Sequence, residues 1–274
     1  MRIYEFGLVL PEDYRLVSKF SLVKVVIGFF GLLWKLYILV VFTITALLFY
    51  PVIVPFLNSD KNKRKAFKLF VVWSWVVRVL CVYFVRFVEK SKLPEGNFVI
   101  IANHASYLDI FLMPSLFPNT PFLFLGKSEI LSYPLIKTYF KKLNIPVYRD
   151  NKLKAARALF QAVEAGRNGW SLVIFPEGGI PDNEQPFLGD FKLGAFQIAR
   201  SVKAPIVPVT FVNNYKLFSD QEHILGEAHP GVSIVHVHPF ISAEDVCHGT
   251  LEELSAKCHD VIKKTLQQHY PDFK

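Results

Sequence analysis

His104 and Asp109 have four residues between them, a spacing that could let a histidine act as a general base. They lie in the stretch Asn103-His104-Ala105-Ser106-Tyr107-Leu108-Asp109, directly after an apolar run at 98–102. In a strand-to-helix turn, this spacing brings the aspartate carboxylate to one imidazole nitrogen and leaves the other nitrogen facing a cleft. We therefore expect Asp109 to orient His104 as a general base.

The spacing alone is weak support, because it recurs in the chain. Eight histidines, each with about a one in ten chance of an acid at the fifth following position, give nearly one accidental match. His248 and Glu253 have the same spacing within a C-terminal helical region, and we interpret them as such an accident. His104 differs by its position after an apolar strand, because crevices in α/β sheets form at the carboxyl ends of strands.

Three further loops each follow an apolar run and carry a charged residue, namely Lys127, Arg149 and Glu177. Taken singly, the two cations are typical of solvated surface charges and Glu177 of a helix or turn cap. Taken with His104, they place a base, two cations and a carboxylate at the ends of neighbouring strands. We expect these groups to converge on one rim.

Short apolar runs alternate with longer amphipathic stretches after residue 96, which is typical of an α/β domain. Strands are expected at 98–102, 122–125, 145–148, 171–175, 206–211 and 232–237. Helices are expected at 108–116, 128–142, 152–166 with Asp150 as its N-cap, 193–201 and 250–269. A sheet flanked by these helices would hold the candidate loops at one edge.

The N-terminal region has the length and polarity of a membrane anchor. Residues 36–57 contain no charge and as a helix would extend about 33 Å, the thickness of a hydrocarbon core. Pro51 and Pro55 can end or kink this helix. Two topologies therefore remain possible for this segment: it spans the bilayer, or it dips into the bilayer and returns.

A basic cluster at 61–68 precedes a second apolar stretch at 69–88, which contains Arg78 and Arg86. Each arginine costs about 2.5–3.5 kcal/mol at the centre of a spanning helix, so burial at the membrane interface is expected. There both guanidinium groups could reach the lipid headgroups. The alternative is a buried helix of a soluble core, which would leave the basic cluster unexplained.

Composition and charge favour a membrane-attached globular protein. The 274 residues are 52% hydrophobic and 20% charged, too apolar for an ordinary soluble enzyme and too charged for a multi-span transporter. Residues 1–90 hold 13 basic and 5 acidic residues, whereas 91–274 hold 18 of each, so the net charge of +8 lies in the N-terminal region. The neutral remainder carries no recognition motif, and no nucleic-acid partner is expected.

No disulfide framework and no metal site are expected. The three cysteines lack the spacing of paired cysteines and favour a reducing compartment; they are Cys81, Cys247 and Cys258. Four histidines in the C-terminal third have no carboxylate or cysteine at ligand spacing; they are His223, His229, His236 and His238. We interpret them as partly exposed strand or loop residues.

Four ordered blocks across 98–212 resemble the 1-acyl-sn-glycerol-3-phosphate acyltransferase (lysophosphatidic acid acyltransferase) family of glycerolipid acyltransferases. The blocks are Asn103–Asp109 (NHASYLD), Gly126-Lys127-Ser128-Glu129 with Val147-Tyr148-Arg149, Phe175-Pro176-Glu177-Gly178, and Val207-Pro208-Val209. A run like the family's F-K-x-G-A also occurs, as Phe191-Lys192-Leu193-Gly194-Ala195. Four blocks in the family's order are a strong signal of this resemblance, whereas a single block would be a weak one.

The resemblance implies a role for each matching residue. His104 looks like the base that removes a proton from a glycerol hydroxyl, and Asp109 like the carboxylate that holds it. Glu177 and Gly178 look like the acceptor-binding loop, and Arg149 with Lys127 or Lys192 looks like a phosphate clamp. Asn103 and Ser106 are implied as further substrate-binding positions. The resemblance implies no cofactor and no metal, with acyl-CoA or acyl-carrier protein as the donor.

One position departs from the family's pattern. Where the family usually continues FPEG with Thr-Arg-Ser, this chain has Gly179-Ile180-Pro181, so Ile180 replaces an arginine credited with phosphate contact. Either Arg149 and the lysines hold the phosphate, or the acceptor is another lysolipid, such as a lyso-ornithine or lyso-glycine lipid.

These expectations combine into one interpretation. An N-terminal membrane-anchoring region at 1–90, with apolar helices at 22–57 and 69–88, precedes an acyltransferase domain at 91–274 with an α/β mixed sheet flanked by helices. The enzyme would acylate a lysolipid, first of all lysophosphatidate to phosphatidate in phospholipid biosynthesis. Its domain would lie on the cytoplasmic face, at the inner membrane in a bacterium. The alternative of another class is an inactive membrane scaffold that binds lipid.

Overall fold

The computed structural model describes residues 12–148, 150–181, 185–219 and 225–273, and the seven strands of this part of the chain form one mixed sheet. The strand order is β1-β7-β6-β2-β5-β3-β4, and all neighbours are parallel except β6 and β7. The strands are β1 (Tyr83–Lys90), β2 (Val99–Ala102), β3 (Phe122–Lys127), β4 (Ile145–Val147), β5 (Ser171–Ile174), β6 (Ile206–Phe211) and β7 (Gly231–Val237). The expected α/β fold with a mixed sheet is confirmed.

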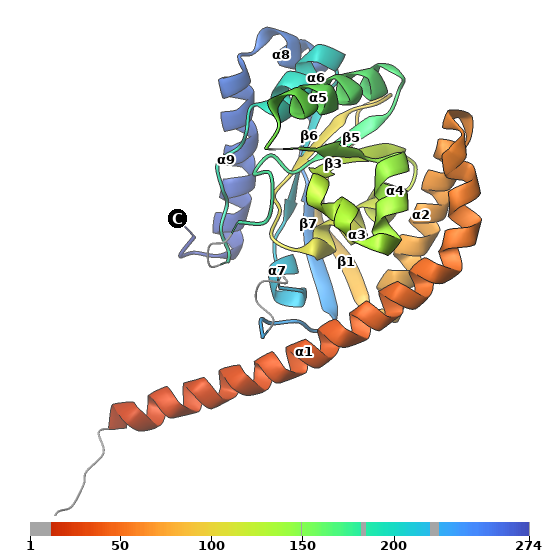
Figure 1. Cartoon of the computed structure of the whole chain (residues 1–274). Helices are drawn as coiled ribbons and strands as arrows, with labels where there is room; N and C mark the ends of the chain where they lie inside the picture. Colours follow the sequence, from red (N-terminus) through yellow and green to blue (C-terminus); the bar gives the residue numbers. More distant parts are fainter. Residues whose placement is uncertain (1–11, 149, 182–184, 220–224, 274) are drawn as a thin grey trace, which may run out of the picture.

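Helices cover both faces of the sheet (Figure 1). One layer contains α5 (Lys152–Arg167), α6 (Gly194–Val202), α8 (Ala243–His248) and α9 (Leu251–His269). The other contains α2 (Asp60–Leu80), α3 (Tyr107–Leu116) and α4 (Pro134–Leu143), with the long α1 (Glu12–Ile53) packed against α2. The 3-10 helix η1 (Val54–Asn58) joins α1 to α2 and also contacts α4, and the short helix α7 (Asn214–Leu217) contacts β7 and α3.

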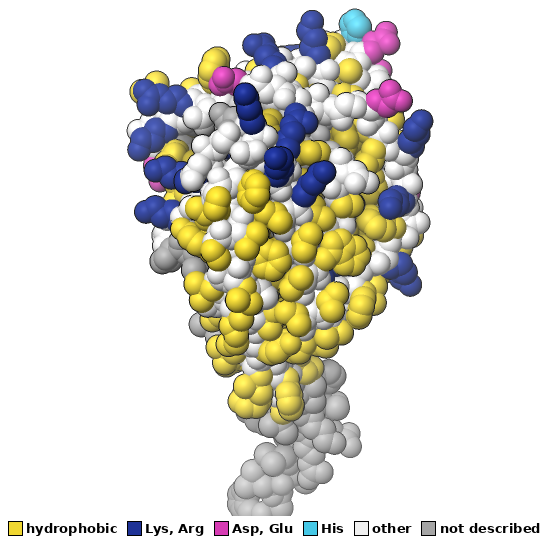
Figure 2. Space-filling model, turned by 90° about the vertical axis from the view of Figure 1, so that its right-hand side faces the viewer, with side chains coloured by type: hydrophobic (Ala, Val, Ile, Leu, Met, Phe, Trp, Pro, Cys, Tyr) yellow, Lys and Arg dark blue, Asp and Glu magenta, His cyan; other side chains and the backbone are white. Residues whose placement is uncertain are grey.

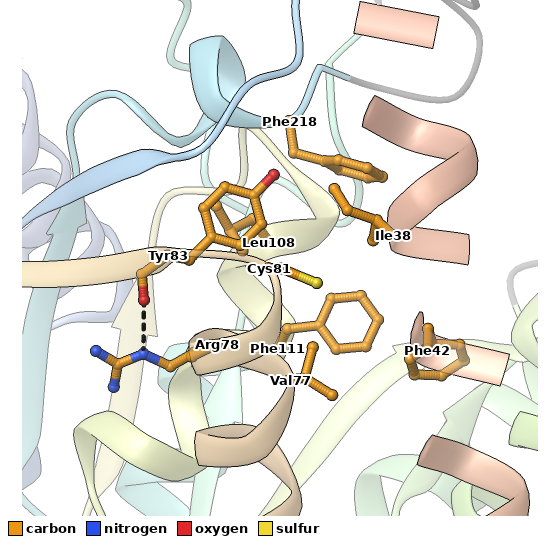
Figure 3. Close-up of a pocket in the computed structure, with 9 residues that line it drawn as sticks. All are labelled: Ile38, Phe42, Val77, Arg78, Cys81, Tyr83, Leu108, Phe111 and Phe218. Carbon is orange, nitrogen blue, oxygen red and sulfur yellow. Dashed lines mark hydrogen bonds between the residues drawn. The ribbon is translucent and has the colours of Figure 1, made fainter. Parts of the chain in front are cut away.

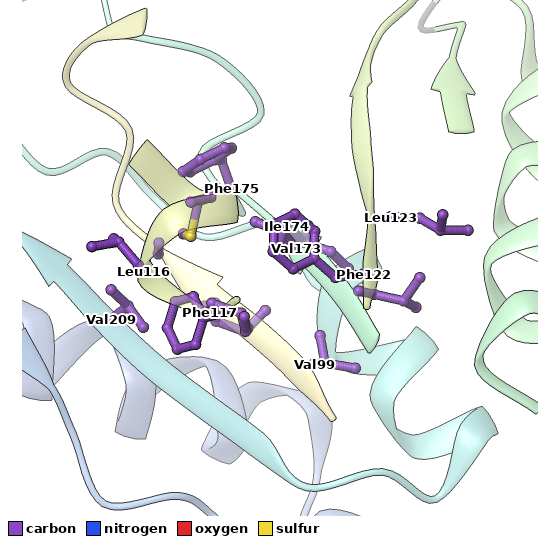
Figure 4. Packing of buried hydrophobic residues seen from close by; sticks show 14 of the residues in the cluster. Val99, Leu116, Phe117, Phe122, Leu123, Val173, Ile174, Phe175 and Val209 are labelled. Carbon is purple, nitrogen blue, oxygen red and sulfur yellow. The ribbon is translucent and has the colours of Figure 1, made fainter. Parts of the chain in front are cut away.

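The central strands are apolar because helices cover them on both sides. Every residue of β2, β5 and β6 is buried. Figure 4 shows how their side chains interlock with those of α3, with Val99 of β2, Val173 of β5 and Val209 of β6 among them. This core fixes the strand ends from which the polar loops leave.

Five parallel strands bring their carboxyl ends to one edge of the sheet. They are β2, β3, β4, β5 and β6. Because β7 runs antiparallel to β6, its first residues also lie at this edge. Loops that are far apart in the sequence therefore meet there, as the sequence predicted for 103–109, 126–129 and 175–178.

Most predicted elements are present with bounds shifted by a few residues, but the helix expected at 128–142 and the Asp150 N-cap were wrong. The helix expected at 128–142 is divided into a 3-10 turn, η2 (Ser128–Ser132), and α4, because Pro134 starts a new helix and restricts the residue before it. The N-cap of α5 is Asn151, not Asp150. The Asn151 side chain accepts a hydrogen bond from the Lys154 N–H at 2.9 Å.

The second apolar helix expected at 69–88 ends at Leu80, and Tyr83–Lys90 forms strand β1. The alternation of more buried and exposed side chains along Tyr83–Lys90 explains the strand, since a period of two suits a sheet and not a helix. Val82 lies between the two elements with a φ of 50°, which breaks the helix. The sheet therefore includes residues on both sides of residue 90.

Arg78 also differs from its prediction. Its side chain was expected to reach lipid headgroups, but it is buried between α2, α3 and β1. Its Nη1 donates to Ser115 Oγ at 2.9 Å and its guanidinium lies over the Trp75 ring, 4.3 Å from the ring centroid. Arg86, expected on a helix, lies instead on the edge strand β1 with its side chain exposed.

The first helix continues through Pro51 to Ile53 before η1 begins, so the proline does not end it. Residues 25–58 form one segment long and apolar enough to cross a membrane, and only 22% of its most apolar window is buried. Figure 1 shows α1 extending well beyond the sheet. Figure 2 shows the adjoining face of the molecule, on which apolar side chains gather with Lys and Arg along one border.

Candidate active site

His104 and Asp109 meet at the sheet edge, where β2 ends and α3 begins. The His104 Nδ1 lies 3.0 Å from Asp109 Oδ2, and both side chains are buried. Ser106, the N-cap of α3, is extended at φ −161° and ψ 148° and forms a capping box with Asp109. The turn thus folds Asp109 back under His104, which confirms the predicted His–Asp contact.

Backbone and side-chain groups surround the Asp109 carboxylate with hydrogen-bond donors. Oδ2 also accepts the backbone N–H groups of Ala105 and Ser106, each at 2.9 Å. Oδ1 accepts from Asn214 Nδ2 at 2.7 Å. Because the carboxylate is wholly buried, these donors replace water in stabilising its negative charge.

The His104 ring is held between Asp109 and an aromatic side chain. It stacks on Phe175, with ring centroids 4.1 Å apart and planes inclined by 19°. Among the described residues, nothing hydrogen-bonds to Nε2, the nitrogen on the far side of the ring from Asp109. Neutral His104 that donates Nδ1–H to Asp109 has a lone pair on Nε2, which suits proton abstraction.

Glu177 joins the His104 loop to another loop of the site. Its Oε1 accepts the His104 backbone N–H and its Oε2 accepts the Gly189 backbone N–H, both at 2.8 Å. Burial raises the pKa of Glu177 to about 7, although the two N–H donors lower it and Asp109 raises it slightly. The position fits a carboxyl group that fixes two loops.

Asn103 and Ser106 are buried and hydrogen-bonded to the protein's own backbone. The Asn103 amide exchanges two hydrogen bonds with Phe211, donating to its C=O at 2.9 Å and accepting its N–H at 2.8 Å. The Ser106 hydroxyl donates to the Phe218 C=O at 2.5 Å and accepts the Leu108 N–H at 3.1 Å. These contacts tie the His104 turn to the end of β6 and to α7.

An open hollow beside Glu177 collects several of the predicted residues. Lys127 lies on its wall with Glu177, and Asp190 brings a second acid. Ile180, the residue that departs from the family's pattern, lines the same hollow. The remaining lining is Gly179, Pro181 and Gly189. The described lining therefore offers one cation and two carboxyl groups to a ligand headgroup.

For the other predicted substrate-binding residues, the structure gives backbone contacts at Gly178 and Lys192. Gly178, with a φ of 84°, turns the chain after Glu177 and its N–H donates to the Phe175 C=O at 2.9 Å. Lys192 has an exposed side chain, and its backbone N–H donates to the Pro176 C=O at 3.0 Å. Arg149 lies outside the described residues.

An apolar pocket lies between the N-terminal helices and the site (Figure 3). Leu108, which precedes Asp109, forms part of its wall together with Phe218, whose C=O accepts the Ser106 hydroxyl. The remaining lining residues come from α1, α2, α3 and the start of β1: Ile38, Phe42, Val77, Arg78, Cys81, Tyr83 and Phe111. The lining is largely apolar, but the cavity, at about 20 Å³, has room for little more than a water molecule.

The second His–acid spacing forms no comparable pair. His248 ends α8 and its Nδ1 is 2.9 Å from the Glu244 C=O, whereas Glu253 accepts the Thr250 N–H at 2.9 Å in the capping box of α9. Hydrogen bonds from Thr250 lower the pKa of Glu253. Asp109 and Glu253 are both capping-box residues. Only His104, however, lies in a strand-to-helix turn that brings its ring onto the acid.

The interpretation of His236 and His238 as partly exposed was wrong, while His229 is exposed and His223 lies outside the described residues. Both rings are buried, His236 on β7 and His238 directly after it. His238 Nδ1 lies 3.1 Å from Glu89 Oε2, and His236 Nε2 lies 3.0 Å from His269 Nε2. Among the described residues, no group of three or more His, Cys, Asp or Glu side chains could hold a metal ion.

Two contributors to the site were missed from the sequence. Asn214 reaches Asp109, and Phe175 stacks on His104. A signal for Asn214 exists, because it follows a predicted strand at 206–211 whose end shares the edge with His104. Phe175 lies in the Phe175-Pro176-Glu177-Gly178 block, but the sequence predicts only that it belongs to a strand.

Sequence comparison places these residues among known proteins. A sequence model of the family described as Acyltransferase matches residues 84–212. The chain is 29% identical over 187 residues to the 1-acyl-sn-glycerol-3-phosphate acyltransferase of Saccharomyces cerevisiae, a match over 67% of this chain and 60% of that protein. It is 28% identical over 221 residues to a putative 1-acyl-sn-glycerol-3-phosphate acyltransferase of Caenorhabditis elegans, over 77% of each. The chain thus spans less than two thirds of the yeast relative.

The fold is also similar to a solved structure. The crystal structure of the 1-acyl-sn-glycerophosphate (LPA) acyltransferase PlsC from Thermotoga maritima matches with a TM-score of 0.73. The match covers 90% of this chain and 99% of that chain, at 22% sequence identity. At this identity the likeness shows the fold.

Proposed function

We propose that this chain, which the Acyltransferase family model matches over residues 84–212, is a membrane-bound enzyme that transfers an acyl chain from a thioester donor to the free hydroxyl of a lysolipid. The observation that carries the proposal is the His104–Asp109 pair at the sheet edge. Asp109 holds Nδ1 of the ring, and no described residue occupies Nε2.

The geometry supports direct transfer. Nε2 of His104 takes the hydroxyl proton while the lysolipid oxygen forms a C–O bond to the thioester carbonyl carbon. The C–S bond then breaks, and the thiolate leaves and takes up the proton from the imidazolium. Asp109 stabilises the imidazolium charge between these two proton transfers. No acyl-enzyme intermediate is required, since a thiolate is a good leaving group.

Lysophosphatidate is the first acceptor to test, giving phosphatidate, because the relatives are named for 1-acyl-sn-glycerol-3-phosphate. Lys127 lines the hollow beside Glu177, and Lys192 and Arg149 are the other proposed phosphate ligands. A charge-assisted hydrogen bond from each contributes about 1.5–3 kcal/mol. Acyl-CoA or acyl-carrier protein would supply the acyl group.

A second acceptor class is favoured by the composition of the hollow. Ile180 brings no charge, and Asp190 and Glu177 face the same space as Lys127. Such a mixture suits a headgroup with both an amine and a carboxylate, as in a lyso-ornithine lipid, better than a phosphate dianion. We propose this class as the alternative substrate of the same reaction.

Residues 1–90 would hold the enzyme on the membrane. Exposed apolar side chains follow α1 from Val25 to Val52 and recur on α2 at Val72, Trp75 and Val79. Figure 2 shows the Lys and Arg border of this face, which would lie against anionic headgroups on the cytoplasmic side.

The proposal is tested by incubating the purified full chain in lipid vesicles with radiolabelled acyl-CoA or acyl-carrier protein and a panel of lysolipids. We expect a labelled diacyl product with lysophosphatidate or with a lyso-amino-acid lipid. No labelled product with any acceptor and either donor would contradict the enzyme proposal and favour a lipid-binding scaffold.

A further inference from the structure

A chain of buried side chains continues beyond the His–Asp pair. Asp109 Oδ1 accepts from Asn214 Nδ2 at 2.7 Å, and Asn214 Oδ1 accepts from Ser233 Oγ at 2.6 Å. All three side chains are fully buried. These hydrogen-bonded side chains join α3, α7 and β7 at the sheet edge where His104 lies.

The chemistry of each group fixes the direction of these hydrogen bonds. A carboxylate only accepts, so Asn214 must turn its NH2 group to Asp109 and its carbonyl oxygen to Ser233. The Ser233 hydroxyl must then donate to that oxygen. Ser233 therefore sets the amide orientation that Asp109 needs.

The two Asp109 carboxylate oxygens accept hydrogen bonds from different parts of the structure. Oδ2 has three donors, all from the turn at 104–106, whereas the donor to Oδ1 comes from a different element, α7. Asn214 thus supplies the hydrogen bond that compensates the second buried oxygen. Loss of this donor would leave Oδ1 without a partner among the described residues, in a place that water does not reach.

We propose that Asn214, oriented by Ser233, is a positioning residue for acyl transfer: it holds the Asp109 carboxylate and stabilises its charge while His104 carries the proton. The inference rests on the proposed function. It assigns a role to two residues outside the four blocks, which end at Val209. Both act through Asp109 and neither contacts a substrate.

The neighbouring Asn213 is a matched control. Its amide also ties α7 to β7, accepting the Ile234 N–H at 2.8 Å and donating to the Val232 C=O at 2.9 Å, but it does not contact Asp109. A variant at Asn213 loosens α7 without changing the donors to the carboxylate. The two asparagines therefore separate positioning of Asp109 from general packing of α7.

The test compares steady-state kinetics of Asn214→Leu, Asn213→Ala, Ser233→Ala and Ser233→Thr in the full chain. We expect Asn214→Leu to lower kcat by about 10- to 100-fold with KM within about twofold, because the loss is in the chemical step. Ser233→Ala should lower kcat by a smaller factor, and Ser233→Thr, which keeps the hydroxyl, should restore it. Asn213→Ala should keep kcat within about threefold of wild type.

A double-mutant cycle checks that Asn214 acts through Asp109. In an Asp109→Asn background, Asn214→Leu should change kcat by less than about twofold. Wild-type kcat in Asn214→Leu, equal losses in both backgrounds, or an equal loss in Asn213→Ala would each overturn the inference. Ser233→Ala keeps the test valid if Asn214→Leu does not fold.

A second readout separates this inference from the proposed function. The Nδ1 proton of His104 should give a low-field NMR resonance that is absent in His104→Gln. We expect it to move further downfield in Asn214→Leu, since a carboxylate that has lost a donor accepts more strongly. If the wild-type chain transfers no acyl group, the proposed function fails, and an unshifted resonance would then overturn the positioning role as well.

Discussion

One oxygen atom of Asp109 both holds His104 and starts a helix. Asp109 Oδ2 lies 3.0 Å from His104 Nδ1 and accepts the Ser106 N–H in the capping box of α3. The His104–Asp109 contact and the helix start therefore stabilise each other. Any change that moves α3 along its axis would also move the carboxylate away from the imidazole.

Asp109→Asn should abolish most of the transfer while leaving the fold in place. An amide at position 109 lacks the charge that stabilises the imidazolium, so we expect kcat to fall by at least about 100-fold. Radiolabelled acyl transfer measures the loss, and thermal unfolding measures the fold. An unfolded variant, or one with more than a tenth of wild-type kcat, would contradict this role.

Glu177→Gln should remove a pH-dependent contribution to stability. Burial raises the pKa of Glu177 from 4.5 to about 7, so the folded state keeps this proton where the unfolded chain has released it. As the pH rises through this window, the ionised carboxyl costs the wild type roughly 3 kcal/mol of folding free energy. Glutamine does not titrate, so the wild-type Tm minus the variant Tm should fall between pH 5 and pH 8. Parallel Tm curves would contradict the raised pKa.

The apolar face of α1 predicts how the protein is extracted from membranes. Concentrated salt screens the contacts of the basic cluster at 61–68, which contribute about 1 kcal/mol per charge, but it does not weaken apolar burial. We expect the full chain to remain in the pellet at high salt and to be released by detergent. Release by salt alone would contradict insertion of α1.

Gly31→Ala should loosen the contact of α1 with the segment after residue 224. A Cβ at Gly31 would lie 2.8 Å from the Gly226 carbonyl oxygen, and the Lys35–Ser219 hydrogen bond of 2.8 Å lies nearby. Either the helix or the segment must shift, so we expect a loss of about 1–3 kcal/mol of stability. Gly194→Ala is the control, because no atom of the residues that the structure describes lies within 4 Å of a Cβ there. Equal Tm changes in the two variants would contradict the close contact.

Local patterns predicted the site better than the N-terminal region. The His104 turn could be placed because a buried strand, an N-cap serine and an acid at the fifth position all lie within one short stretch. Asn214 could not, since its contact with Asp109 depends on β6 lying beside β2, a long-range pairing. Arg78 was misplaced for the same reason, because its partner Ser115 lies on another helix.

The strand β1 shows why hydropathy alone misled at residues 83–90. These residues continue the apolar stretch of α2, and the change of period from helix to strand occurs at Val82 without a proline or glycine. Pairing with β7 stabilises the strand. In this pairing Tyr83 lies opposite Gly231, which is 148 positions later in the sequence. The sequence around residues 83–90 contains no trace of that partner.

The most direct test of the account compares acyl transfer by His104→Gln and His248→Gln with that of wild type. Both histidines precede an acid at the fifth position, but only His104 contacts it. We expect His104→Gln to lose at least about 100-fold in kcat and His248→Gln to keep wild-type kcat, with both variants folded. Full transfer by a folded His104→Gln variant would contradict the central claim that His104 is the general base.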